Sequence, residues 1–363
     1  MALSHRRMLW GDGGAPTSAA TQVRALGTPG LDWLIVVLNL IFVGGVCADV
    51  WSHRFFGPDN YVFSAYHVSF VTALVFLGGV LAGAAWQQRR AGTPWQVALP
   101  VGYTMTCAMV VVFFAGTLVD QVGHWVFGFE RGFEALMSPS HLLLFLTGGL
   151  ALGGAVRACA RRLADVAHPG VLPRLPLLIN VALVLAWVTL ANVAWMPLTG
   201  DPRGFPMVEA ARTANPDVGQ GYGVARLSLQ TAVLMGGLLW LTQAVQMPLG
   251  GFTVVLAVYG TLCSILMGSA MLWPLWLLSG VASDAVYRWL RPAPRARARF
   301  MAFGILIPII LWGLFYGFLA VTHTGGGVWW SGYVWTGSLV YPGIIGGLLA
   351  FLMSAGYPAQ EVR

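Results

Sequence analysis

The chain has 363 residues, of which 57% are hydrophobic and 9% are charged, and its formal net charge is +7. This composition excludes an ordinary soluble domain. The basic residues form short clusters between apolar runs, as the positive-inside rule describes for membrane proteins, so the net charge does not indicate nucleic-acid binding. The four cysteines form no CxxC pair and therefore predict no disulfide framework.

Residues 1–30 are polar and glycine-rich, without the features of a signal peptide, and we expect them to form a cytoplasmic segment. Apolar runs of about 20 residues then recur along the chain, the length that crosses a hydrocarbon layer of about 30 Å. They lack the alternation of barrel strands, so we expect helices. The fold class is all-α, a polytopic membrane bundle of about ten spans: 31–50, 62–88, 95–120, 137–157, 174–196, 227–247, 251–268, 270–289, 299–321 and 334–355.

Arginine-rich connections follow the second, fourth and eighth of these spans. With ten spans and both termini cytoplasmic, all of them lie on the cytoplasmic side, which the positive-inside rule favours. The count depends on residues 251–289, where a single long helix would place the Arg288–Arg299 cluster outside. A break near Gly268–Trp273 restores the rule. Asp284 and Arg288, four residues apart, are expected to pair on one helix.

The chain divides into three parts on this basis. Residues 1–30 precede a duplicated hairpin module at 31–165, and further transmembrane helices follow at 166–363. An external loop near 197–226 is expected to cap the outer face. We expect a multi-pass protein of a bacterial plasma (inner) membrane, in contact with the lipid bilayer. Small-residue patterns such as Gly78-Gly79, Gly83 and Gly346-Gly347 fit close helix packing.

A three-residue pattern occurs twice in the hairpin module. The first copy contains Asp49 and His53, then Phe56-Gly57, then His67 in Ser64-Ala65-Tyr66-His67. The second contains Asp120 and His124, then Phe127-Gly128, then His141 in Ser138-Pro139-Ser140-His141. The Asp-to-His step is four residues in both copies, so the two side chains share one face of a helix. The predicted topology places both triads at the outer membrane boundary.

A carboxylate and two imidazoles are a usual ligand set for copper, iron or zinc. Ionisable groups at membrane depth are costly and indicate a functional site. The simpler interpretation of one copy is a hydrogen-bonded Asp–His pair at a helix end. Its repetition, with a second histidine across each loop, favours metal. Haem is disfavoured, because Gly57-Pro58 interrupts any single helix that would carry His53 and His67.

At these residues the chain resembles the C subunit of the copper membrane monooxygenases, the family of particulate methane and ammonia monooxygenases. That subunit has an Asp-x3-His motif, a short loop and a second histidine after a Ser/Thr-Pro element. It also has a second, similar triad in which Asn replaces the Asp. Here Asp120 stands at that position. The resemblance covers only about residues 31–157.

The resemblance implies copper bound by six ligands, Asp49, His53, His67, Asp120, His124 and His141. It further implies oxidation of a small lipophilic substrate with O₂, and as partners other membrane subunits and an external cupredoxin-like subunit. A homo-oligomer is also compatible. The sequence thus predicts a copper-binding membrane protein, a subunit or relative of a membrane monooxygenase. The alternatives are a non-redox metal transporter, sensor or chaperone, or a structural zinc site, with zinc or iron in place of copper.

Overall fold

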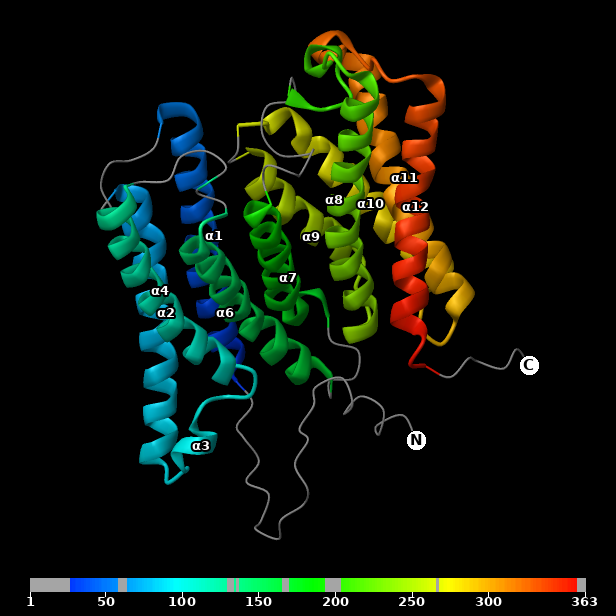
Figure 1. Ribbon diagram of the computed structural model, residues 1–363. Coiled ribbons are helices and arrows are strands. Elements are labelled where there is room, and N and C mark those ends of the chain that lie inside the picture. The colour runs from blue at the N-terminus through cyan, green and yellow to red at the C-terminus, as the bar shows by residue number, and fades with distance from the viewer. Residues whose placement is uncertain are drawn as a thin grey trace, which may run out of the picture.

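The computed structural model describes residues 27–57, 64–128, 134, 137–164, 170–192, 204–265 and 268–357. Within these ranges the regular structure is helical, apart from one isolated bridge between Val208 and Val328 (Figure 1). The helices are α1 (Pro29–Phe56), α2 (Ala65–Arg90), α3 (Trp95–Ala98), α4 (Thr104–Phe127), α6 (Pro139–Ala164), α7 (Val171–Ala191), α8 (Pro216–Ala244), α9 (Gly251–Gly260), α10 (Trp273–Leu290), α11 (Arg297–Thr322) and α12 (Gly332–Ser354).

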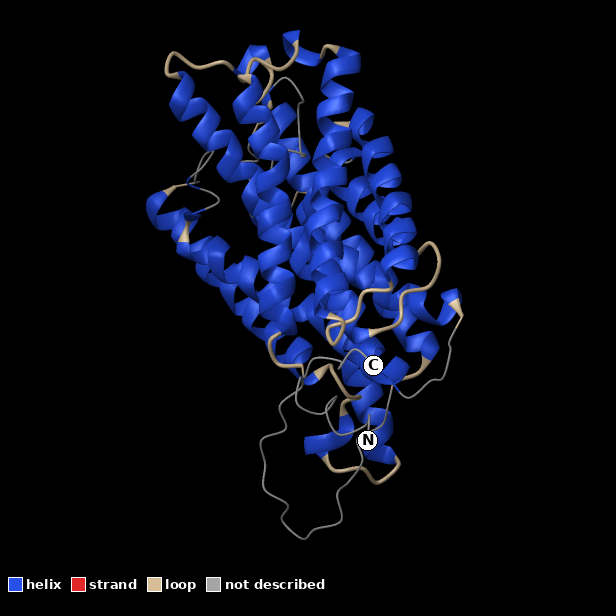
Figure 2. Cartoon of the chain, turned by 90° about the vertical axis from the view of Figure 1, so that its right-hand side faces the viewer, coloured by secondary structure: helices blue, strands red, loops and turns tan. Residues whose placement is uncertain are grey.

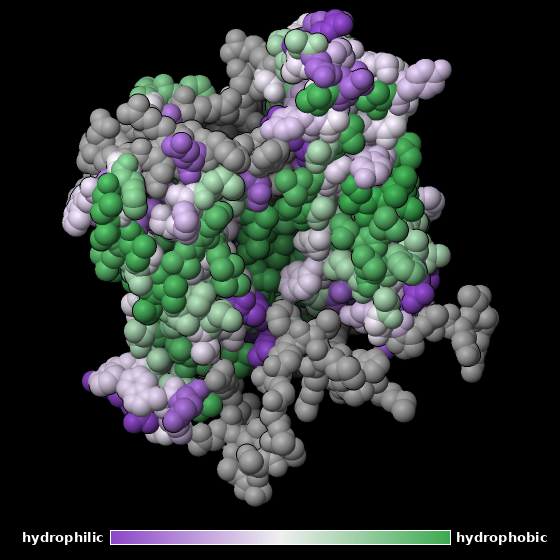
Figure 3. Space-filling model, viewed as in Figure 1, coloured by the Kyte–Doolittle hydropathy of each residue, from purple (hydrophilic) through white to green (hydrophobic). Residues whose placement is uncertain are grey.

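Eight helices in the described residues are long and apolar enough to cross a membrane, namely α1, α2, α4, α6, α7, α8, α11 and α12. The chain is therefore an all-helical integral membrane protein. Its surface agrees, because hydrophobic residues form a band between two more hydrophilic ends (Figure 3). On α4, for example, Val111, Leu118 and Trp125 are 69–77% exposed, which suits contact with lipid tails.

The structure confirms the break in 251–289 but not the count of about ten spans. Helix α9 continues as a π-helical turn, Thr261–Ile265, and α10 begins at Trp273. Between them Gly268 has a φ of +83°, and Pro274 lies in the first turn of α10. Helix α9 and its π turn rise only about 22 Å, too short to cross the membrane unaided. Asp284, near the end of α10, contacts the start of α9, so the pair forms a hairpin that begins and ends at the same end of the bundle. The sidedness of later helices is therefore unchanged.

The helices form two groups (Figure 1). In the view turned by 90°, the long helices run roughly along one direction (Figure 2). The hairpins α1–α2 and α4–α6 make one group, and α8 and α10 to α12 make the other. Helix α7 joins them, packing against α1 and α6 on one side and α9 on the other. Helices α1 and α4 end, and α2 and α6 begin, at what we call the triad end. Arginines cluster at the opposite end, the arginine end: Arg89, Arg90, Arg161, Arg162, Arg288, Arg291, Arg297 and Arg299.

A buried polar cluster at the arginine end holds the two hairpins together. Asp32, in the first turn of α1, forms an ion pair with Arg162 at the end of α6. The Tyr103 hydroxyl, just before α4, donates to the other Asp32 oxygen at 3.4 Å. Burial raises the pKa of the Tyr103 phenol, so this group stays neutral and remains a donor. These contacts hold α1, α4 and α6 together at the end opposite the triads.

Of the expected outer loop near 197–226, residues 197–203 lie outside the described residues, and the predicted loop is already helical from Pro216 onward. Helix α8 begins at Pro216 because Asn215 accepts the N–H of Val218 and proline suits the first helical position. Residues 204–212 lie against the α11–α12 loop, where the indole N–H groups of Trp329 and Trp330 both donate to the Pro206 carbonyl.

Candidate metal centre

The two triads are placed by the same local structure. In the first hairpin, Asp49 and His53 lie in the last two turns of α1, which ends before Gly57 at a φ of +88°. In the second, Asp120 and His124 lie near the end of α4, which ends before Gly128 at a φ of +85°. A positive φ suits glycine, so each glycine ends its helix at the same place relative to the Asp–His pair.

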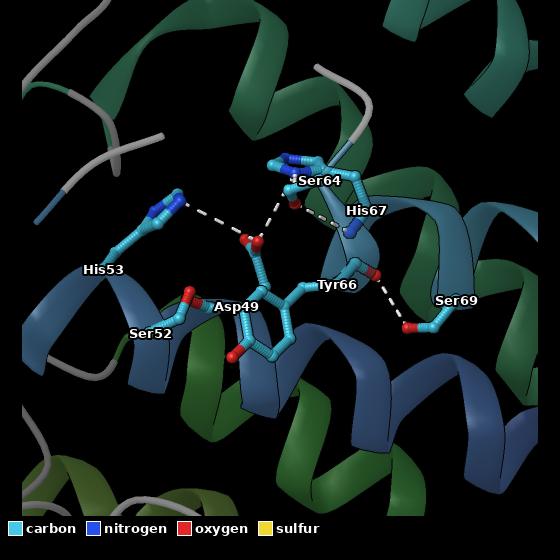
Figure 4. A network of polar contacts seen from close by, with 7 residues as sticks. All are labelled: Asp49, Ser52, His53, Ser64, Tyr66, His67 and Ser69. Atoms are coloured by element: carbon cyan, nitrogen blue, oxygen red, sulfur yellow. Dashed lines mark hydrogen bonds and ion pairs between the residues drawn. The ribbon is translucent and has the colours of Figure 1, made fainter. Parts of the chain in front are cut away.

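In the first triad both imidazoles face one carboxylate (Figure 4). Asp49 Oδ1 lies 3.8 Å from His53 Nε2 and 3.4 Å from His67 Nδ1. The Asp49 side chain is 12% exposed, whereas that of His53 is 37% exposed. The ring centroids of the two histidines are 6.2 Å apart. The structure therefore brings together the three residues that the sequence predicts, from two helices.

The second triad repeats this arrangement. Asp120 Oδ2 lies 3.1 Å from His124 Nε2, and Asp120 Oδ1 lies 3.7 Å from His141 Nδ1. The two ring centroids are 6.3 Å apart. The His124 side chain is only 9% exposed, so this triad is more enclosed than the first. The Oδ1 atom of Asp120 is buried and accepts no hydrogen bond from the described residues.

A serine holds the second histidine in each triad. Ser64 caps α2 by accepting the N–H of His67 at 3.2 Å, and its Oγ also lies 2.7 Å from His67 Nδ1. Ser138 does the same for His141, with distances of 3.3 and 2.6 Å. The signal in the sequence is a serine three residues before a histidine at the start of a helix, which is an N-cap position.

An aromatic layer lies beneath both triads and consists of Phe42, Phe70, Phe113, Phe145 and Trp187. The Phe42 ring is 6.4 Å from Phe70, 5.9 Å from Phe113 and 4.9 Å from Trp187. Phe70 is 5.4 Å from the ring of His67. Trp187 is 5.8 Å from Phe145, which lies one helical turn after His141. The layer therefore connects the two hairpins through α7, and it contacts the first triad through Phe70.

The donor set fits a transition metal, although the side chains are not closed around one. Two ligand atoms bound to one metal at a tetrahedral angle lie about 3.3 Å apart. The Asp–His separations across each helix turn, 3.8 and 3.1 Å, bracket that value. Two imidazoles on one metal would have ring centroids roughly 5 Å apart, so the rings would need to approach by about 1 Å. As placed, no three His, Cys, Asp or Glu side chains among the described residues form a metal-binding group.

Two further features bear on the triads, namely acidic residues nearby in the sequence and a small cavity. Three acidic residues are close to the triads in the sequence, and two of them, Asp59 and Glu130, lie outside the described residues. Glu134 is exposed, and its carbonyl accepts the N–H of Ser138 at 2.9 Å. A small cavity of about 10 Å³ lies between α8, α9, α10 and α11, lined by residues such as Leu234, Ser279 and Pro308. It is therefore not beside either triad.

Fold and site together define an all-helical membrane protein with a duplicated hairpin that carries one carboxylate and two imidazoles in each copy. No protein-family model, no curated protein and no solved structure matches the chain. The resemblance to copper membrane monooxygenases therefore rests on the motifs of the two triads alone.

Proposed function

We propose that the chain is a copper-binding integral membrane protein, a subunit or relative of a membrane-bound copper monooxygenase that oxidises a small lipophilic substrate with O₂. The observation that carries the proposal is the repetition of one arrangement. Two hairpins, 71 residues apart at the Asp, each bring a carboxylate and two imidazoles together, with a serine on the same histidine. A chance ion pair at a helix end gives no reason for this full set to occur twice.

The choice of metal follows from donor chemistry and the resemblance. Imidazole ligands favour the later transition metals, and affinity rises from iron to copper along the divalent series. An all-oxygen calcium site is disfavoured by the same donors. Zinc and iron remain the alternatives to copper, and metal analysis decides between them.

The residues have separable tasks in this proposal. Asp49 and Asp120 supply the negative charge that offsets a bound cation, and the histidines bind as neutral imidazoles. When bound, copper would supply O₂ activation through an open coordination position. The first triad is the better candidate for that role, because half-exposed His53 leaves it more accessible than the second. The aromatic layer provides an apolar boundary beside both sites.

The proposed setting is a bacterial plasma membrane with both termini and the arginine end on the cytoplasmic side. The arginine clusters at one end of the bundle support this orientation. The triads then face outward, where an external cupredoxin-like subunit and other membrane subunits would meet them. A homo-oligomer is equally compatible with the apolar surface in Figure 3.

Metal analysis of the purified protein tests the proposal. We expect about one copper per occupied triad, since each triad provides one set of three ligands. His53→Ala and His124→Ala should each remove the copper of one site. His323→Asn is the matched control, because His323 is exposed at the triad end with a φ of +47° that asparagine tolerates. Copper retained in both alanine variants, or no metal in the unaltered protein, would contradict the assignment.

A structural zinc site is the second candidate function. It is favoured by the enclosed second triad and by the location of the described cavity, which is away from both triads. Zinc at one ion per site, with no redox-dependent spectral change, would support this candidate over copper chemistry.

A further inference from the structure

We propose that Ser64 and Ser138 are positioning residues that fix the tautomer of His67 and His141, so that each ring keeps its proton on Nδ1 and presents Nε2 as the ligand atom. The tautomer itself concerns the metal-free protein. Its consequence for metal affinity rests on the function proposed above.

The first step is the hydrogen-bond inventory of the serine. A serine hydroxyl has one proton and accepts two hydrogen bonds. In each hairpin one acceptor position is used by the backbone N–H of the histidine, at 3.2 Å from Ser64 and 3.3 Å from Ser138. Ser138 Oγ also lies 3.2 Å from Ser140 Oγ, where either hydroxyl can donate. The short contact to Nδ1, at 2.7 and 2.6 Å, then has two forms. Either Nδ1–H donates to the serine, or the serine hydroxyl donates to a bare Nδ1.

The second step is the charge beside the same nitrogen. Asp49 Oδ1 is 3.4 Å from His67 Nδ1, and Asp120 Oδ1 is 3.7 Å from His141 Nδ1. These distances exceed a good hydrogen bond, but the carboxylate still acts on the ring through its charge. It attracts an N–H and repels a lone pair. The proton is therefore favoured on Nδ1, and the serine accepts it.

The consequence is a defined ligand atom. With the proton on Nδ1, the lone pair of the neutral imidazole is on Nε2, and only that nitrogen can bind a metal. Histidine ligands commonly donate their other N–H to a neighbouring oxygen, which sets the orientation of the ring. Here that oxygen comes from the helix cap, so the start of α2 or α6 and the ligand geometry depend on one side chain.

The tautomer can be measured without metal. In protein labelled with ¹⁵N-histidine, NMR of the metal-free state should show His67 and His141 with protonated Nδ1 and bare Nε2. Ser64→Ala removes the acceptor of Nδ1–H and should move His67 part of the way toward the Nε2–H form that free histidine prefers, since the Asp49 charge still acts on Nδ1. Ser64→Asp, which accepts but cannot donate, should keep Nδ1 protonated. An Nε2–H tautomer for His67 in the unaltered protein would overturn the proposal.

A matched control separates the tautomer from helix capping. Ser331 caps α12 by accepting the N–H of Val334 at 3.4 Å, and the described structure gives it no histidine partner. Ser331→Ala therefore removes a cap alone and should leave the histidine signals and metal affinity unchanged. If it alters them as much as Ser64→Ala does, the serines act only as caps and the proposal is wrong.

Metal binding supplies the second readout. We expect Ser64→Ala to weaken binding at the first triad by about 10- to 100-fold, as losses of such supporting contacts do, and Ser64→Thr to restore it. Pulsed EPR of the Cu²⁺-loaded protein should detect a changed remote nitrogen in Ser64→Ala. Unchanged affinity and EPR in that variant would overturn the positioning role. Absence of metal binding in the unaltered protein would refute the proposed function, while the NMR result would still decide the tautomer.

Discussion

Asp284 shows how a single polar residue can be assigned the wrong partner from sequence. Its spacing to Arg288 predicts an ion pair on one helix. In the structure its two oxygens instead accept the backbone N–H groups of Phe252 and Thr253 at 3.1 and 3.0 Å, and the Thr253 hydroxyl at 2.6 Å. The carboxylate therefore caps the start of α9 from α10, and its charge suits the positive end of that helix.

The two assignments make different predictions for stability. Asp284→Ala should lower the free energy of unfolding by about 2 kcal/mol, because two buried N–H groups lose their acceptor. Arg288→Gln should change it by less than about 0.5 kcal/mol, as expected for a surface residue. Thermal unfolding in detergent, with helicity as the signal, measures both. Equal losses in the two variants would restore the ion pair as the explanation.

The approach of the three side chains to one another within each triad, by contrast, is predictable at the residue scale. Asp49 and His53 share a helix face by spacing alone, and the same holds for Asp120 and His124. The approach of His67 and His141 follows from the short loops. Spacing also indicates that Ser64 caps α2, because it lies three residues before His67 at the start of a helix. Spacing does not provide the contact of the Ser64 hydroxyl with the His67 ring, which depends on the three-dimensional turn.

At the scale of elements, the positions of glycines in the sequence predict only some of the close contacts between helices. Gly346 of α12 meets Gly304 of α11, where a Cβ on Gly346 would lie 2.0 Å from the Gly304 carbonyl oxygen. The sequence prediction of close packing is thus confirmed at Gly346. Gly79 and Gly83 on α2 have open space where a Cβ would be, so that prediction is wrong for contacts within the chain. Composition does not reveal which face of a helix meets a neighbour.

The contact between α11 and α12 leads to a second stability prediction. Gly346→Ala should destabilise the protein by about 1–3 kcal/mol, because the atom in the way is backbone and cannot rotate aside. Gly313→Ala on α11 is the control, since a Cβ there meets nothing within 4 Å, and it should stabilise the helix by up to about 1 kcal/mol. Comparison of the two melting temperatures is the measurement. A neutral Gly346→Ala would show that the helices separate easily.

The α9–α10 pair is the element that sequence describes least well. Its break is predicted by the conflict between one long helix and the arginine clusters, and the structure shows it. The distance that α9 and α10 extend into the membrane is not predicted, because an apolar segment has the same composition whether it crosses the membrane or returns halfway. Packing decides instead. Trp276 of α10 donates to Ser264 in the π turn at 2.8 Å, which ties the two short helices into one hairpin.

At the scale of the whole molecule, the two helix groups depend on different kinds of sequence information. The first group is readable because its hairpin is duplicated, so each copy supports the interpretation of the other. The second group has no repeat and only scattered polar residues, and its cap of 204–212 forms through contacts with a loop more than 100 residues later. For both groups, the arginine clusters predict only which end of the helices faces the cytoplasm.

Sidedness gives the last prediction. Residues 251–290 leave and return to one end whether α9 and α10 cross the membrane fully or partly, so positions before and after them must lie on the same side. In a Cys107→Ser background, with Cys47, Cys159 and Cys263 buried, single cysteines at Ala91, Leu249 and Ala293 report the arginine end. A cysteine at the exposed Ala214 reports the triad end.

A membrane-impermeant thiol reagent applied to sealed vesicles of known orientation should label the first three cysteines from the cytoplasmic side and the fourth from the other side. The reason is that an even number of passes separates Leu249 from Ala293, and an odd number separates either from Ala214. Labelling of Ala293→Cys together with Ala214→Cys would mean that 251–290 crosses once, against both the break at Gly268 and the arginine distribution. Labelling of the whole set with reversed sides would keep the fold and place both triads in the cytoplasm, where no external cupredoxin-like subunit could reach them.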